Sequence, residues 1–229
     1  MLVLDMPEGG VAQQEFEPEE FDAIAPERGG RLGGIMLGEP LWRARFELGR
    51  SLTRDASDDW RAFIARLRRS QRPFLAYDHD RIFPRAYPRG FSRMTRPDGS
   101  PFDGSAASWS AQATSDFDEL VTLTQLPGNL LLGKGDYIGF KWDAEGSNAG
   151  TYDRRAMVRV VEPARANAAG EITVMVEMPV PTRVVPETAI AHLDKPCCLM
   201  RRTGGSLGML DRRQKIAGGT LEALQDLRP

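Results

Sequence analysis

Cysteine, histidine and long apolar runs are all scarce in this chain of 229 residues. Cysteine and histidine each occur only twice. Because neighbouring cysteines rarely satisfy disulfide geometry, Cys197 and Cys198 predict two buried or half-buried free thiols and no secreted disulfide framework. No apolar run approaches the roughly 18 residues of a membrane span, and no basic segment followed by an apolar one opens the chain. We therefore expect a protein that folds in a reducing cytoplasm and does not enter a membrane.

Catalytic and metal-binding patterns are scarce as well. Two histidines disfavour a zinc site with the usual three protein ligands. His79 lies between two aspartates, which fits an acid–base or metal site or a polar turn; we favour the turn because no second histidine is near. The serines between residues 105 and 110 lack the G-x-S-x-G pattern, and residues 133–136 lack the spacing of a phosphate-binding loop. We expect no catalytic residue, no cofactor and no metal.

Net charge is close to zero but is unevenly distributed. The formal net charge of −2 gives no overall electrostatic argument for nucleic acid. The segment up to Asp22 is nevertheless acidic, while residues 61–72 and 81–96 are basic. A local basic surface therefore remains possible in the middle of the chain.

The second basic segment lies in a long proline-containing stretch, residues 78–104. Its arginines alternate with aromatic residues: Arg81, Phe83, Arg85, Tyr87, Arg89, Phe91, Arg93 and Arg96. Such a set suits single-stranded nucleic acid, where aromatic rings stack on bases and arginine contacts phosphate. It equally suits a protein–protein surface, where arginine and aromatic residues are enriched. We favour the protein surface, because the acidic N-terminal segment offers a complementary surface on a neighbouring copy.

Strand patterns dominate the rest of the chain. Residues 41–48 alternate, with Trp42, Ala44, Phe46 and Leu48 on one face. Further strands are predicted where β-branched and aromatic residues gather between turn residues: 1–6, 74–77, 119–126, 136–142, 155–162, 171–178 and 197–201. Residues 7–38 are interpreted as an extended arm or long loop, 105–116 as a polar segment anchored by Trp109, and 182–196 as a linker with at most one short strand.

One amphipathic helix is predicted over residues 55–69. Asp55 or Ser57 suits its N-cap, and Trp60, Phe63, Ile64 and Leu67 form one apolar stripe. Residues 221–227 suggest a short terminal helix or a tail. The expected fold class is therefore mainly β with one or two helices.

Several of these motifs resemble a known family. A tryptophan-bearing strand, the W-x-x-F-x-x-x-L helix and the following FLAYD at 74–78 resemble the distal tail protein of long-tailed, siphophage-type bacteriophages. The G-D-Y-I-x-F pattern at 135–140, RRAMVRVVE from residue 154 and EITVMVEMPVP from residue 171 look like proteins of the phage tail-tip hub. The resemblance covers roughly residues 41–200.

The resemblance implies a β-sandwich belt domain of residues 1–77 and 187–229, with an inserted loop-rich β domain at 78–186. It implies a ring of six copies in the virion that joins the tail tube to the hub and receptor-binding proteins, while DNA passes through the lumen without specific binding. The interface candidates are Glu17, Glu19, Trp42, Arg43, Arg45, Phe46, Arg81, Arg85, Arg89 and Phe91.

Two alternatives stay open. The nearer one is a tail tube or tube-terminator protein, which is also a β-rich ring former. The other is a carbohydrate-binding or carbohydrate-degrading module at the tip, with Trp109 or Trp142 as a stacking platform and Asp116 with Glu119 as the acid pair.

Overall fold

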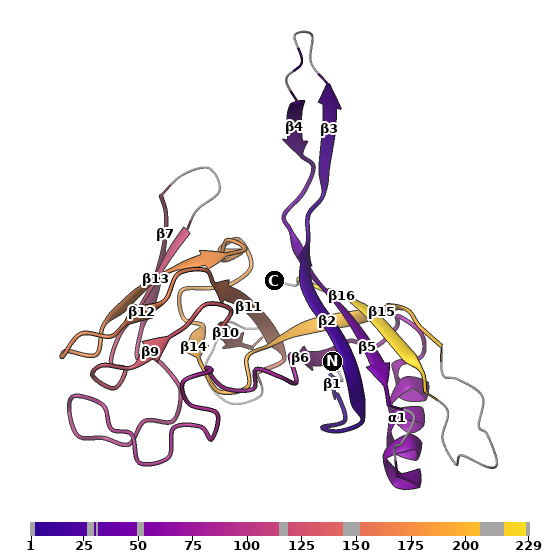
Figure 1. Ribbon diagram of the computed structural model, residues 1–229, viewed down its shortest axis with the longest axis horizontal. Coiled ribbons are helices and arrows are strands. Elements are labelled where there is room, and N and C mark those ends of the chain that lie inside the picture. Colours follow the sequence, from indigo (N-terminus) through magenta and orange to yellow (C-terminus); the bar gives the residue numbers. More distant parts are fainter. Residues whose placement is uncertain are drawn as a thin grey trace.

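The computed structural model describes residues 3–26, 30, 32–49, 53–114, 119–143, 152–206 and 218–227. Two six-stranded sheets form most of this part of the chain, and one helix packs beside the first (Figure 1). The prediction of a mainly β fold with a helix is confirmed.

The first sheet has the strand order β1-β6-β15-β16-β5-β2, and only β1 and β6 pair in parallel. Strand β5 buries Trp42, Ala44 and Phe46 and exposes the residues between them, as the alternation predicted. The strands are β1 (Leu4–Asp5), β2 (Val11–Glu19), β5 (Leu41–Leu48), β6 (Phe74–Tyr77), β15 (Cys197–Gly204) and β16 (Thr220–Gln225).

Helix α1 (Arg54–Leu67) covers part of the first core with the predicted apolar stripe. Its N-cap is Thr53, whose hydroxyl oxygen accepts a hydrogen bond of 3.3 Å from the backbone N–H of Ala56, so neither Asp55 nor Ser57 has that role. The helix ends before residue 69 because Arg68 has the left-handed conformation, with φ of 47°.

The second sheet has the strand order β14-β10-β11-β13-β8-β7 and is antiparallel throughout. A small sheet of β9 and β12 lies beside it. Ile138 and Phe140 on β10 and Val158 on β11 are fully buried in the second core. The strands are β7 (Trp109–Ala113), β8 (Glu119–Leu123), β9 (Leu131–Leu132), β10 (Tyr137–Trp142), β11 (Arg154–Val160), β12 (Ala164–Arg165), β13 (Ile172–Glu177) and β14 (Ile190–His192).

Three segments differ from the predictions. For residues 7–38 we predicted an extended arm or a long loop, and the described part of this segment forms strands: β2 pairs along β5, and β3 (Asp22–Pro26) pairs with β4 (Leu32–Met36) in a projecting hairpin (Figure 1). The C-terminal segment is not a helix. Its strand β16 lies between β15 and β5 and pairs antiparallel with both. The segment around Trp109 is the edge strand β7 rather than an irregular stretch.

The two sheets meet where β10 and β11 approach β5. Trp42 Nε1 donates a hydrogen bond of 2.8 Å to the carbonyl oxygen of Met157, and its ring packs edge-on against Tyr137 at 5.7 Å. Both partners belong to the second sheet but are buried in the first core. This contact fixes how the two sheets are placed relative to each other.

The chain enters the second sheet after β6 and leaves it after β14. All strands of the first sheet come from residues 4–77 and 197–225, and those of the second from 109–192. Because β14 pairs with β10, the return lies a few residues later than the expected boundary at 187.

Candidate assembly surface

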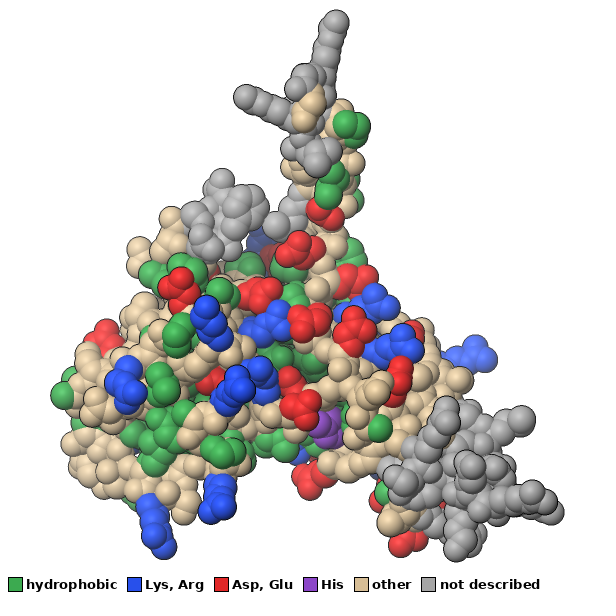
Figure 2. All heavy atoms as spheres, in the orientation of Figure 1, with side chains coloured by type: hydrophobic (Ala, Val, Ile, Leu, Met, Phe, Trp, Pro, Cys, Tyr) green, Lys and Arg blue, Asp and Glu red, His purple; other side chains and the backbone are tan. Residues whose placement is uncertain are grey.

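The β3–β4 hairpin extends beyond the ends of β2 and β5, away from both sheets (Figure 1). Every residue of β3 is exposed. The three most exposed large hydrophobic side chains in the described residues belong to this region: Ile24 is 64% exposed, and Ile35 and Leu37 are each 70% exposed. Figure 2 shows hydrophobic side chains on the projecting hairpin, clear of the rest of the molecule.

The strand register explains why these side chains stay uncovered. Ile24 lies opposite Gly34, and Ile35 lies opposite Ala23, so each isoleucine faces a small residue across the hairpin. Because neighbouring residues of a strand point to opposite faces, the two isoleucines lie on opposite faces. A hairpin that is apolar on both faces fits insertion between two surfaces. An isolated two-stranded hairpin is marginally stable in water, and exposed apolar patches mark interaction sites.

A second exposed element is the outer edge of β7. This strand pairs only with β8 in the described part of the chain, and its sequence Trp-Ser-Ala-Gln-Ala contains no charge and no proline. By contrast, the edge strand β2 has several glutamates, a proline and a register shift near Val11, features that discourage further pairing. The β7 edge therefore lacks these protections against adding another strand.

Three predicted interface residues are buried in the chain's own cores. Trp42 and Phe46 have no exposed area, and Phe91 is 7% exposed. Their side chains are therefore not free to contact another copy, and including them among the interface candidates was wrong. The physical reason is that β5 turns its apolar face to the first core, while Phe91 packs against Phe102 in the second at 4.9 Å.

The acidic candidates already have partners within the chain. Glu17 lies 2.6 Å from the guanidinium of Arg159, which also binds Glu177 at 2.8 Å. Glu19 lies 4.0 Å from Arg43. These pairs arise because β2 lies in register beside β5 and close to β11.

Arg43 and Arg45 point outward from β5, as the alternation predicted. The two arginines lie opposite Glu17 and Glu15 on β2, and Arg45 forms an ion pair of 3.0 Å with Glu47. Exposed pairs of this kind contribute little stability, so these arginines remain candidates for contacts with another copy.

In the basic loop, the arginine side chains have different surroundings. Arg81 is half-buried, lies 4.0 Å from the buried carboxylate of Asp136 and donates to the carbonyl oxygen of Lys134. Arg85 and Arg89 are exposed. Of the basic candidates in this loop, these two are the ones whose charge faces solvent.

The aromatic residues of the same loop pack inward. Phe83 and Tyr87 contact Phe91 at ring distances of 5.8 and 5.9 Å, and the Tyr87 hydroxyl oxygen accepts a hydrogen bond of 2.8 Å from the N–H of Leu131. Rings held this way do not form a platform for bases. The aromatic residues of the loop therefore do not support its interpretation as a surface for nucleic acid, which requires rings free to stack on bases.

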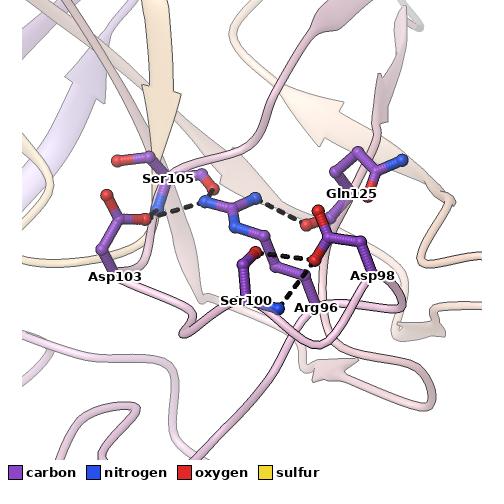
Figure 3. A network of polar contacts seen from close by, with 6 residues as sticks. All are labelled: Arg96, Asp98, Ser100, Asp103, Ser105 and Gln125. Atoms are coloured by element: carbon purple, nitrogen blue, oxygen red, sulfur yellow. Dashed lines mark hydrogen bonds and ion pairs between the residues drawn. The ribbon is translucent and has the colours of Figure 1, made fainter.

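Arg96 ties the loop to the second sheet (Figure 3). Its guanidinium donates to the carbonyl oxygens of Gln125 at 2.6 Å and Ser105 at 2.7 Å, and pairs with Asp103 at 2.9 Å. Partial burial raises the pKa of Asp103, but hydrogen bonds from Ser105 and Arg96 outweigh it and hold that pKa below its usual value. Arg96 is thus a structural residue, and the loop is folded against the sheet.

The residues considered for catalysis or metal binding have structural surroundings. His79 is half-buried beside the ring of Tyr77 at 4.6 Å, and desolvation lowers its pKa. Cys197 and Cys198 are buried free thiols, as predicted, and burial raises both pKa values. Within the part of the chain that the structure describes, no three His, Cys, Asp or Glu residues gather where they would hold a metal ion.

Of the residues named for the carbohydrate alternative, Glu119 and Trp142 are buried and Trp109 is half-buried. Asp116 lies outside the described residues; Glu119 is buried and accepts a hydrogen bond of 2.5 Å from the N–H of Val180, and desolvation raises its pKa. Trp142 is 2% exposed. Trp109 donates from Nε1 to the carbonyl oxygen of Ala189 and packs on the second core.

No protein-family model matches this sequence, and no curated protein is significantly similar to it. No helix among the described residues is long and apolar enough to cross a bilayer.

Proposed function

We propose that this chain is a structural assembly protein whose copies close into a ring at the tip of a phage tail. The ring joins the tail tube to the hub and receptor-binding proteins. The observation that carries the assembly role is the β3–β4 hairpin, which exposes one isoleucine on each face at 64% and 70%. The resemblance of the helix and strand motifs to distal tail proteins supports the proposed location at the tip of a phage tail and the expectation of six copies in the ring.

The occupant proposed for the hairpin's contacts is a second copy of this chain. Contact between two different surfaces of identical subunits is heterologous, and such contacts close into rings when the rotation between subunits permits it. The β7 edge is the receiving surface we favour, because a protected edge strand would not accept another strand. The hairpin and β7 lie on different parts of the molecule (Figure 1), as a heterologous contact requires.

Charge substitution on the hairpin tests this proposal. The double variant Ile24→Lys and Ile35→Lys should fold normally, because both side chains are exposed in the isolated chain. It should lose the oligomer formed by the wild type, since each lysine would have to enter an apolar contact. Native mass spectrometry gives the oligomeric state, and far-UV circular dichroism gives the fold.

The matched control is Val161→Lys, which changes a 39% exposed apolar residue outside the hairpin and should leave the oligomer intact. If the hairpin variant has the same oligomer mass as the wild type, the hairpin does not take part in the contacts between copies, and the proposal is contradicted. The tube or terminator alternative predicts the same ring, and it is separated by which purified tail protein the ring binds.

A further inference from the structure

Two cavities of similar size lie near the junction of the sheets, and their linings differ. The cavity between the two sheets, of about 230 Å³, is lined by three carboxylates and three cations, so its charges balance. The other cavity, of about 220 Å³, lies beside the loop after β13, between the segment that precedes β5 and the end of β16. We call it the Glu119 cavity. The assembly role makes no use of it.

Glu119 supplies a hydrogen-bond acceptor to this cavity. The residue is 8% exposed, and its Oε2 accepts a hydrogen bond of 2.5 Å from the backbone N–H of Val180. The other oxygen, Oε1, has no hydrogen-bond partner and no cation among the described residues. It is also not one of the partnerless polar atoms that the described part of the chain encloses completely. Oε1 is therefore open to a group that enters the cavity.

Gln225 supplies a donor to the same cavity. It is 6% exposed, and its Oε1 accepts a hydrogen bond of 3.1 Å from the backbone N–H of Trp42. Because an N–H group only donates, the side-chain atom that meets it is the oxygen, and Nε2 is left with two hydrogens to donate. Nε2 has no partner within the described ranges and is not completely enclosed either.

The rest of the lining is mostly apolar and leaves Glu119 without a counter-charge. Arg183 is the cation of the lining, but its side chain is 88% exposed and lies 4.0 Å from Glu39, the second carboxylate there. Unsatisfied polar groups in such surroundings cost free energy, so a ligand that pairs with both of them is stabilised. The apolar lining consists of Met157, Met178, Pro179, Val180, Pro181 and Leu227.

The two open polar groups select the chemistry of the ligand. An ammonium group would pair with Glu119 but leave the Gln225 donor unsatisfied, and a carboxylate would be repelled by Glu119. A ketone or an ester offers no donor. A primary carboxamide carries both a donor and an acceptor on one planar group. A volume of about 220 Å³ is below the range of drug-sized ligands, so it suits a short group rather than a large cofactor.

We propose that the Glu119 cavity binds a carboxamide group, whose NH₂ donates to Glu119 Oε1 and whose carbonyl oxygen accepts from Gln225 Nε2. The alkyl part of the ligand packs against the methionine side chains of the lining, which adapt readily to the shape of a ligand. The carboxamide belongs either to a small free amide or to an asparagine or glutamine side chain of a peptide. This proposal does not depend on ring assembly.

Saturation-transfer difference NMR of the full chain with butyramide tests the proposal. The comparison ligands are 2-pentanone, butyrate and butylammonium, which have nearly the same size but lack the donor, the neutral donor–acceptor pair or the acceptor. The measurement is made at pH 8, because burial raises the pKa of Glu119 and its ionised form is the acceptor. Butyramide should bind saturably in the millimolar range, and each of the others should bind about tenfold more weakly or worse. Tighter binding of N-acetylglutamine methylamide than of butyramide identifies a peptide side chain as the ligand, and the reverse identifies a small amide.

Two isosteric variants should change the preferred ligand rather than merely weaken binding. Gln225→Glu keeps the acceptor for the Trp42 N–H but replaces the free donor by an acceptor, so it should prefer butylammonium. Glu119→Gln keeps the acceptor for the Val180 N–H but presents a donor, so it should prefer butyrate. Glu171→Gln, at an exposed glutamate outside the cavity, should keep the wild-type order of affinities. Circular dichroism checks that each variant is folded.

Three results would overturn the proposal. The first is that butyramide shows no saturable binding, which would mean that the cavity holds only water. The second is that the wild type binds 2-pentanone, butyrate or butylammonium as tightly as butyramide. The third is that the order of affinities in a folded Gln225→Glu or Glu119→Gln variant is the same as in the wild type.

Discussion

Mild acid is expected to destabilise the protein through His192. Its pKa is about 3 in the folded chain, against about 6.5 in an unfolded chain. Between these two values the unfolded chain binds the proton and the folded chain does not, so the stabilising contribution is complete above pH 6.5 and is lost as the pH falls toward 3. The cause is desolvation first, reinforced by the charge of Lys141.

The size of the effect follows from how far the pH lies below the pKa of His192 in the unfolded chain. At pH 5 the loss is about 2 kcal/mol, since each pH unit corresponds to about 1.4 kcal/mol. The half-buried His79 has a lowered pKa and acts in the same direction. Other groups titrate too, so the contribution of His192 is isolated by comparison with His192→Gln, which cannot take up the proton.

The assay is urea unfolding followed by far-UV circular dichroism at pH 7.5, 6 and 5, in phosphate-free buffer at one low protein concentration. The wild type should lose about 2 kcal/mol more than His192→Gln between pH 7.5 and pH 5. The variant His79→Gln should retain most of the wild-type slope. Parallel pH profiles for wild type and His192→Gln, or an imidazole that titrates near pH 6.5 by NMR in the folded protein, would refute the reasoning.

Two further substitutions test the junction between the sheets and the basic loop. Trp42→Phe removes the donor to the Met157 carbonyl at 2.8 Å and should lower the free energy of unfolding by about 1–3 kcal/mol, measured by urea unfolding; an unchanged midpoint would show that this hydrogen bond does not stabilise the junction. Reversing the charges of Arg85 and Arg89 together should weaken ring assembly without altering the fold, because both are exposed; an unchanged oligomer mass by light scattering would exclude them from the interface.

The elements with a strong local pattern were predictable from the sequence. Strand β5 alternates over its whole length, and α1 repeats its apolar residues at helical spacing, so both were located to within a few residues. The cap of α1 was misplaced because several residues near its start can accept a hydrogen bond, and only the backbone geometry selects Thr53.

Elements that depend on distant partners were not predictable. Strand β16 is short, and it is a strand because β5 and β15 flank it in the folded chain. The strands of the β2 to β4 region were not predicted, and the segment was interpreted as an extended arm or a long loop, because glycines and acidic residues obscure its alternation. The sequence does not single out the exposed residues Ile24 and Ile35, because the same segment also contains Phe21, Leu32, Met36 and Leu37.

The cavity between the two sheets had no signal in the sequence at all. Lys141, Arg155 and His192 come from three separated strands and meet only through the pairing of β10 with β11 and β14. The interface prediction failed at Trp42, Phe46 and Phe91 for a related reason, because composition identifies arginine and aromatic residues but does not say which of them the cores will enclose.

Electron microscopy of the purified wild-type chain, with native mass spectrometry of the same sample, tests the central claim most directly. The proposed function predicts closed rings of identical copies, with the β3–β4 hairpin of each copy in contact with the next. A protein that stays monomeric at concentrations of tens of micromolar, or that forms only open, irregular assemblies, would contradict it.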